Sequence, residues 1–212
     1  MQRCRTILGW VAVSLVVGLS ASGTARAGMS VAYDQTTSMG GDVSHSKVMI
    51  KDTLFRVETE AEGTRSIIIR NPRGIFNYFP DEGRAMKLPM LTPAQRPMHD
   101  VTDYSDHLKQ MAAKQVGAEV INGYPCDVYE FTDRDAGNAA TKAWVLQKKG
   151  FPVRVEVDGS DGLTVIELSN IQPDAELDDA LFELPDGVNV MDVGGGLPQG
   201  PSDALGGRSQ GQ

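Results

Sequence analysis

The chain has 212 residues and a net charge of −8 at pH 7, so its surface repels nucleic acid and anionic lipid head groups. Its two cysteines are Cys4, which precedes the apolar N-terminal run and is expected to be removed with it, and Cys126, so we expect no internal disulfide. Beyond residue 27 no segment has the roughly 18 consecutive apolar residues of a transmembrane helix, so we expect no membrane-spanning helix there.

The N-terminus has the three parts of a secretory signal peptide. Two arginines precede a mostly apolar run over residues 7–19, and Ala25-Arg26-Ala27 supplies the small residues at a cleavage site. We therefore expect residues 1–27 to be removed and the mature protein to work outside the cytoplasm. The remaining 185 of the 212 residues suffice for one domain, and the loss of three arginines lowers the net charge to −11.

Short alternating runs separated by turn residues follow the signal peptide, and the first of them, from Ser30 to Ser38, is a predicted strand. Phe55 and Val57 alternate with charged residues, and Asn71-Pro72-Arg73-Gly74 is a strong turn signal. This spacing predicts an antiparallel meander, in which each strand pairs with the next through a tight turn.

The meander is interrupted by a proline-rich segment and a predicted helix. Tyr104, Leu108 and Met111 recur at spacings of four and three residues, which predicts a helix over residues 100–116. Gly117 suits the end of this helix.

Strands resume after the helix. Asn122-Gly123 marks a turn, residues 151–157 alternate strictly between apolar and polar, and a hairpin turn follows at residues 159–162. Residues 178–182 predict one short helical turn. The Gly, Pro, Ser and Gln composition of residues 193–212 predicts a disordered tail.

These elements predict one domain over residues 28–192, of the mainly β (α+β) class. A single antiparallel sheet of this many strands must curl or close, here as an open half-barrel with the inserted helix as a lid. If the helix covers only part of one face, an apolar concavity remains.

Several short motifs occur in a specific order and spacing. They are Leu54-Phe55-Arg56-Val57-Glu58, Tyr78-Phe79-Pro80-Asp81, residues 119–126, Trp144, Gly150-Phe151-Pro152-Val153 and Leu181-Phe182-Glu183-Leu184-Pro185. Together, over residues 29–191, they resemble the LolA-like superfamily, the periplasmic carriers of outer-membrane lipoproteins, and the later motifs resemble a less characterised branch of it.

The resemblance implies an unclosed barrel with helices as a lid over an apolar cavity, which holds acyl chains in the characterised carriers. It also implies a periplasmic location. In those carriers an arginine lies just before the strand that corresponds to the one with Leu54 and Phe55 here, and it holds the lid closed. This chain has Lys51, Asp52 and Thr53 there, and Lys51 matches the arginine poorly.

An acyl-binding cavity needs apolar side chains on one face of the sheet, because each buried methylene contributes about 0.8 kcal/mol. The same alternation also fits an ordinary core packed on the helix, since it shows which residues share a face and not whether that face is hollow. The candidate cavity residues are Phe55, Val57, Ile67, Ile69, Phe76, Tyr78, Phe131, Trp144, Leu146, Val153 and Val155.

Metal binding is a weaker interpretation. His99, Asp103 and His107 share one face of the predicted helix. The two histidines are eight residues apart, which is about 12 Å along the helix axis and too far for both to bind one ion. A solvated helix face with charge pairing explains them better. Four methionines also surround the lid segment and fit an adaptable lid better than a copper site. They are Met86, Met90, Met98 and Met111.

Catalytic motifs are missing from the sequence, which has neither a Gly-x-Ser-x-Gly elbow nor a His-Glu-x-x-His pair. Cys126 is interpreted as a small buried residue in preference to a nucleophile or a redox site. We expect no metal and no cofactor.

The sequence therefore predicts a non-enzymatic periplasmic protein that binds a hydrophobic ligand, either a lipid or the acyl part of an envelope lipoprotein. The alternative is a protein-interaction or envelope-stress-sensing module with a filled core, whose sheet edge or acidic face docks a partner.

Overall fold

The computed structural model describes residues 29–61, 63–89, 104–134, 137–147, 149–160 and 162–192. The predicted signal peptide and the predicted tail lie outside these residues. Within them no helix is long and apolar enough to cross a membrane.

The described chain forms twelve strands, one α-helix and two short 3-10 helices. Their bounds are β1 Ser30–Met39, β2 Asp42–Lys51, β3 Leu54–Ala61, β4 Thr64–Asn71, β5 Gly74–Phe79, η1 Pro80–Glu82, β6 Arg84–Leu88, α1 Tyr104–Gln110, β7 Lys114–Ile121, β8 Tyr124–Asp133, β9 Ala139–Leu146, β10 Pro152–Gly159, β11 Gly162–Pro173, η4 Asp179–Phe182 and β12 Asn189–Asp192.

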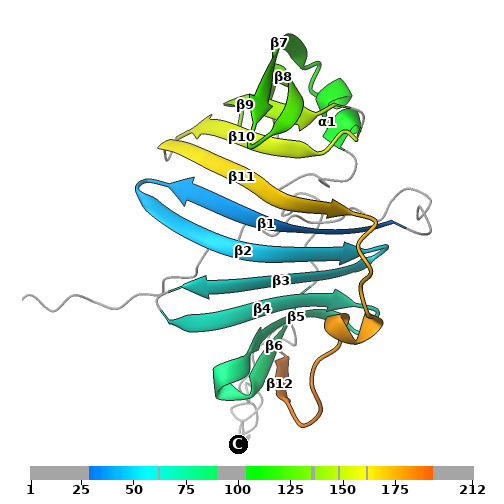
Figure 1. Ribbon diagram of the computed structural model, residues 1–212. Helices are drawn as coiled ribbons and strands as arrows, with labels where there is room; N and C mark the ends of the chain where they lie inside the picture. The colour runs from blue at the N-terminus through cyan, green and yellow to red at the C-terminus, as the bar shows by residue number, and fades with distance from the viewer. Residues whose placement is uncertain are drawn as a thin grey trace, which may run out of the picture.

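All twelve strands belong to one curved sheet with the order β12-β6-β5-β4-β3-β2-β1-β11-β10-β9-β8-β7 (Figure 1). Two meanders, β1–β6 and β7–β11, join where β1 pairs with β11 as well as with β2. The sheet does not close, because β12 and β7 remain as its two edges. The predicted mainly β, open half-barrel architecture with a helix is confirmed.

Turn chemistry sets the register of the hairpins. Asn122 and Gly123 connect β7 to β8 with φ values of 51° and 83°. Two consecutive positive φ values are those of a type I′ turn, whose twist matches the flanking strands, and Asn-Gly is the sequence that this turn prefers.

The predicted helix over residues 100–116 is wrong at its C-terminal end. The helix α1 ends at Gln110, Ala112 adopts a φ of 51°, and Lys114 already begins β7. Tyr104 and Leu108 keep the predicted spacing and are buried. After Ala112 the chain forms a strand because β7 pairs with β8 along most of its length, with one irregularity between Gln115 and Gly117.

The predicted helical turn near residues 178–182 is confirmed as η4. Its Phe182 is fully buried against Ala32 and Met49. The side-chain amide of Asn71 donates a hydrogen bond to the Phe182 carbonyl over 2.8 Å, and Arg56 Nη1 donates to the Leu181 carbonyl over 2.8 Å. These contacts hold the segment that follows β11 against strands β1 to β4.

The segment after β11 has two further features that sequence patterns did not indicate. Lys51 Nζ donates to the Leu177 carbonyl over 2.8 Å and lies 2.6 Å from Asp179 Oδ1, so it ties this segment to the end of β2. Beyond η4 the chain forms β12, which pairs in parallel with β6.

Candidate functional site

Cross-strand pairing assigns each strand residue to one of two faces of the sheet. Val57 lies opposite Val48 on β2 and Ile68 on β4, so these three share a face. We call the side that carries Val57 face A. When the register is followed through β1, β11 and β10, Trp144 falls on the other side, which we call face B.

Two neighbouring rows of apolar side chains cross face A. Together with Phe151 and two residues of β11 they form a cluster in which every side chain is buried. Among the described residues, none in this cluster comes from a helix, because α1 packs on a separate cluster over β9 and β10, and η4 packs on face B. The ten members are Val31, Tyr33, Val48, Ile50, Phe55, Val57, Ile68, Phe151, Ile166 and Leu168.

A polar row borders the apolar rows on face A. Gln35 lies opposite Ser46, Ser46 opposite Thr59, and Thr59 opposite Ser66. The hydroxyls of Ser46 and Thr59 are 2.8 Å apart, and Gln35 Nε2 donates to Thr37 Oγ1 over 3.2 Å. Face A therefore combines an apolar surface with hydrogen-bonding groups beside it, as an amphiphile requires.

The predicted cavity residues divide between the two faces. Face A carries Phe55, Val57, Phe131 and Val155. Face B carries Ile67, Ile69, Phe76, Tyr78, Trp144 and Leu146, and Val153 packs with the face-B cluster around Trp144. The structure does not bring the eleven residues to one surface, and ligand contact by any of them stays a prediction.

Sequence reasoning missed Ile68, Tyr33 and Gln35 on face A. Ile67, Ile68 and Ile69 are three consecutive apolar residues, all buried, so this strand has apolar residues on both faces. Alternation cannot select a face in such a run. The sequence did contain a signal for Gln35. It follows Tyr33 by two residues in a strand, so the two side chains lie on the same face.

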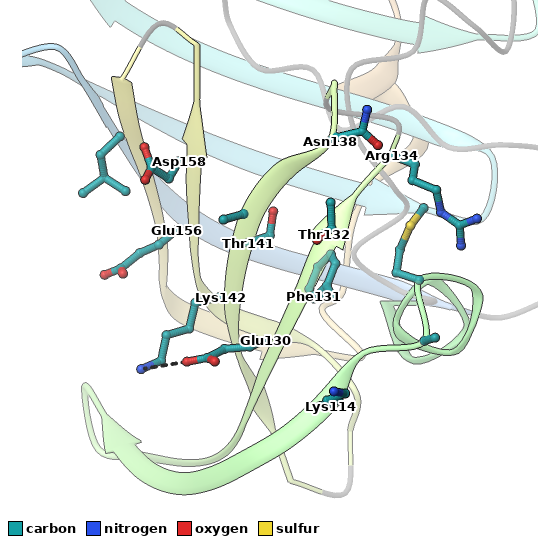
Figure 2. A pocket seen from close by; sticks show the side chains of 14 residues that line it. Lys114, Glu130, Phe131, Thr132, Arg134, Asn138, Thr141, Lys142, Glu156 and Asp158 are labelled. Atoms are coloured by element: carbon teal, nitrogen blue, oxygen red, sulfur yellow. Dashed lines mark ion pairs between the residues drawn. The ribbon is translucent and has the colours of Figure 1, made fainter.

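A groove of about 900 Å³ lies at the β7–β10 end of the sheet (Figure 2). Lys114, Glu130, Lys142 and Glu156 line it and form one cross-strand row on face B, in which the sign of the charge alternates. Lys142 Nζ lies 3.8 Å from Glu130 Oε1. Polar and apolar residues line this groove together, and Phe131 is the one predicted cavity residue among them.

Trp144 is held by polar contacts on face B. Its indole Nε1 donates to Glu119 Oε2 over 2.8 Å. Lys142 Nζ and Arg154 Cζ lie 5.0 Å and 5.4 Å from the ring centroid, within the range of cation–π attraction. The side chain packs with Cys126 and Val128. Trp144 thus belongs to the packed core of this end of the sheet.

A buried cluster of titratable groups lies under α1. His107 Nε2 is 3.7 Å from Asp133 Oδ2, and the Tyr104 ring packs beside His107. Burial, with a smaller contribution from the charge of Asp133, raises the pKa of Tyr104. A raised pKa keeps the phenol protonated, which is the opposite of what a nucleophile needs.

His107 and Cys126 are both buried. His107 does not lie on a solvated helix face, because it is only 3% exposed; His99 and Asp103 lie outside the described residues. Cys126 is fully buried, as predicted, and burial raises its thiol pKa, which makes it inert. The described part of the chain holds no group of three or more His, Cys, Asp or Glu residues suited to a metal.

Comparison with known proteins finds similarity at the level of structure. No protein-family profile matches the sequence, and no characterised protein shows significant sequence similarity to it. An uncharacterized conserved protein from Thermus thermophilus superposes with a TM-score of 0.55 at 14% identity, over 79% of this chain and 91% of that chain.

Two further proteins are similar. MucB of Pseudomonas aeruginosa superposes with a TM-score of 0.51 at 15% identity, over 78% of this chain and 61% of MucB. MucB in complex with MucA(peri) gives a TM-score of 0.50 at 16% identity, over 77% of this chain and 57% of that chain. A LolA superfamily protein from Nitrosomonas europaea is matched more loosely, with a TM-score of 0.35 at 16% identity, over 74% of this chain and 90% of that chain.

At such identities the similarity concerns the fold alone. The fold expected from the sequence motifs is confirmed: one long antiparallel sheet, curled and unclosed, with a helix packed on part of one face. The chain spans about three fifths of the length of MucB.

Proposed function

We propose that this protein is a non-enzymatic periplasmic binding protein that holds the acyl chain of a lipid or of a lipoprotein on face A. The observation that carries the proposal is the ten-residue apolar cluster, which is built from five strands and Phe151 and includes no residue of a described helix. Each buried methylene contributes about 0.8 kcal/mol, so a chain lying along two apolar rows binds tightly without specific polar contacts. The polar row from Gln35 to Ser66 lies beside the apolar rows, where the polar head group of such a ligand would be placed.

Filling face A is expected to weaken binding, whereas filling face B is not. Ile68 and Ile67 are consecutive residues of β4 with exposed fractions of 7% and 5%, and they lie on opposite faces. We expect Ile68→Phe to lower the affinity for a dansylated C11 fatty acid about tenfold, because the larger ring occupies the proposed acyl surface. Ile67→Phe is the matched control and should change the affinity by less than about twofold.

Fluorescence titration of both variants and the wild type measures this difference. Thermal unfolding by circular dichroism establishes that both variants are folded at the assay temperature. Equal weakening by the two substitutions, or no binding of the probe to the wild type, would count against acyl binding on face A.

Docking of a protein strand is a second candidate function, favoured by the edge strand β7. Val116 and Val120 are 52% and 69% exposed there. The strand pairs with β8, and its Glu119 accepts the hydrogen bond from Trp144. The alternating charge row ends at Lys114 on this edge. A partner strand with a carboxylate opposite Lys114 and valine-like residues opposite Val116 and Val120 would continue both patterns. MucB, of similar fold, is known in complex with MucA(peri).

A pair of nine-residue peptides tests this second candidate. Both have valine at positions three, five and seven and threonine elsewhere, and position eight is glutamate in one and lysine in the other. The bulge of β7 between Gln115 and Gly117 takes up one extra residue. With position eight opposite Lys114, position seven therefore lies opposite the bulge that contains Val116, and position three lies opposite Val120. We expect the wild type to bind the glutamate peptide about threefold more tightly, and Lys114→Glu to reverse the preference. Val120→Glu should weaken both peptides, whereas Val43→Glu, at an exposed site on β2, should not. Fluorescence anisotropy measures the affinities, and an unchanged preference in Lys114→Glu would rule out this register.

A further inference from the structure

Gln35 carries a buried hydrogen-bond acceptor that has no donor among the described residues. The residue lies on β1 and its side chain is only 5% exposed. Its Nε2 donates to Thr37 Oγ1 over 3.2 Å, but its Oε1 is buried and accepts no hydrogen bond from any residue that the structure describes. Buried side-chain oxygens nearly always have a partner, since an unsatisfied one has lost its hydrogen bonds to water.

The position of Gln35 relates this acceptor to the proposed acyl surface. Gln35 is opposite Ser46 on β2 and Leu168 on β11, so it lies on face A. Along β1 it follows Tyr33 of the apolar row by two residues, which is about 7 Å. A ligand whose chain lies in the apolar rows would therefore place the first atoms beyond the chain near Gln35.

No neighbouring polar group that the structure describes donates a hydrogen bond to this acceptor. The hydroxyls of Ser46 and Thr59 pair with each other over 2.8 Å, and Ser66 Oγ donates to Asn77 Oδ1 over 2.7 Å. Gln35 thus offers an acceptor at the border of an apolar surface, where a ligand that supplies a donor satisfies it and a ligand that has only acceptors does not.

We propose that Gln35 Oε1 accepts a hydrogen bond from the group next to the ligand's acyl chain, so that the site prefers acyl compounds with an N–H or O–H donor there, such as amides, over acceptor-only esters. The proposal rests on acyl binding at face A and specifies the ligand class for that surface. The expected discrimination is large for one contact, because an acceptor-only ligand leaves the buried oxygen unpaired.

Two probes with the same chain test this preference: dodecanamide, which has donors next to the chain, and methyl dodecanoate, which has none. Competition against the dansylated fatty acid gives both affinities. We expect the wild type to bind dodecanamide about tenfold more tightly than methyl dodecanoate. Gln35→Leu and Gln35→Met should both abolish this ratio, and they should retain or improve binding of the ester. Two variants are used so that a folding defect in one does not decide the outcome.

Gln172→Leu is the matched control, because Gln172 is an exposed glutamine on the same sheet, and it should keep the wild-type ratio. An equal affinity of the wild type for the two probes would overturn the role of Gln35 and leave acyl binding intact. A ratio that survives in both Gln35 variants would overturn it as well. If neither probe displaces the dansylated acid and the acid itself does not bind, the proposed function fails together with this inference.

Discussion

Replacing Phe182 with alanine is expected to lower the free energy of unfolding by about 3–5 kcal/mol, the usual cost of removing a fully buried phenylalanine. The ring has no exposed surface and packs on Ala32 and Met49 of face B. Its backbone carbonyl accepts the hydrogen bond from Asn71, so the cavity would open at the point where the C-terminal segment is attached. Urea unfolding followed by circular dichroism measures the change, provided that the transition is two-state.

Val190→Ala on β12 is the control for this experiment. Val190 is 44% exposed and follows Phe182 in the same segment, so its truncation should change the free energy of unfolding by less than about 0.5 kcal/mol. Similar losses from both substitutions would show that the segment is held along its whole length, and a loss under about 1 kcal/mol for Phe182→Ala would show that its burial contributes little.

Trp144→Ala is expected to be similarly destabilising, at about 3–5 kcal/mol, without a specific effect on acyl binding. The side chain is buried on face B, hydrogen-bonded to Glu119 and flanked by the cations of Lys142 and Arg154. Face A lies on the other side of the sheet. The folded fraction of the variant should therefore bind the dansylated fatty acid as the wild type does. Fluorescence titration and urea unfolding of the same preparation separate the two quantities.

Trp144→Phe separates packing from the indole hydrogen bond. It keeps most of the buried ring and removes Nε1, so we expect a loss of about 1 kcal/mol. A loss for Trp144→Phe as large as that for Trp144→Ala would place most of the stabilisation in the contact with Glu119. A tenfold loss of probe affinity in folded Trp144→Ala would mean that the ligand reaches face B.

Much of the strand pattern could be predicted, because it depends on local chemistry. The alternation of residues 151–157 predicted β10, and the Asn122-Gly123 pair predicted the turn before β8. The spacing of Tyr104 and Leu108 indicated α1, but its end was placed too late, because pairing of Lys114 with Glu130 is a long-range contact that no helical periodicity reveals. β12 was missed for the same reason: its four exposed residues have no pattern of their own and are ordered by β6.

The candidate site was predicted less well than the fold, and the reason is the sheet itself. Apolar residues with period two fix which side chains within one strand share a face, so Phe55 and Val57 were grouped correctly. Whether Trp144 lies on that face depends on the register across β1, β11 and β10, including the irregularities in β10 and β11. A strand such as β4, which has buried apolar residues on both faces, gives no local signal for which of its residues belong to face A.

The sequence by itself determined the fold class, most of the strands with their hairpin pairing, and the burial of Cys126, because periodicity, turn residues and side-chain hydrophobicity act over a few neighbouring positions. Only the tertiary structure decided which apolar residues form face A, that Lys51 and Asn71 hold the C-terminal segment, and that Gln35 Oε1 is buried without a described donor. These properties depend on the register of strands far apart in the chain, where a shift of one residue moves every side chain to the other face.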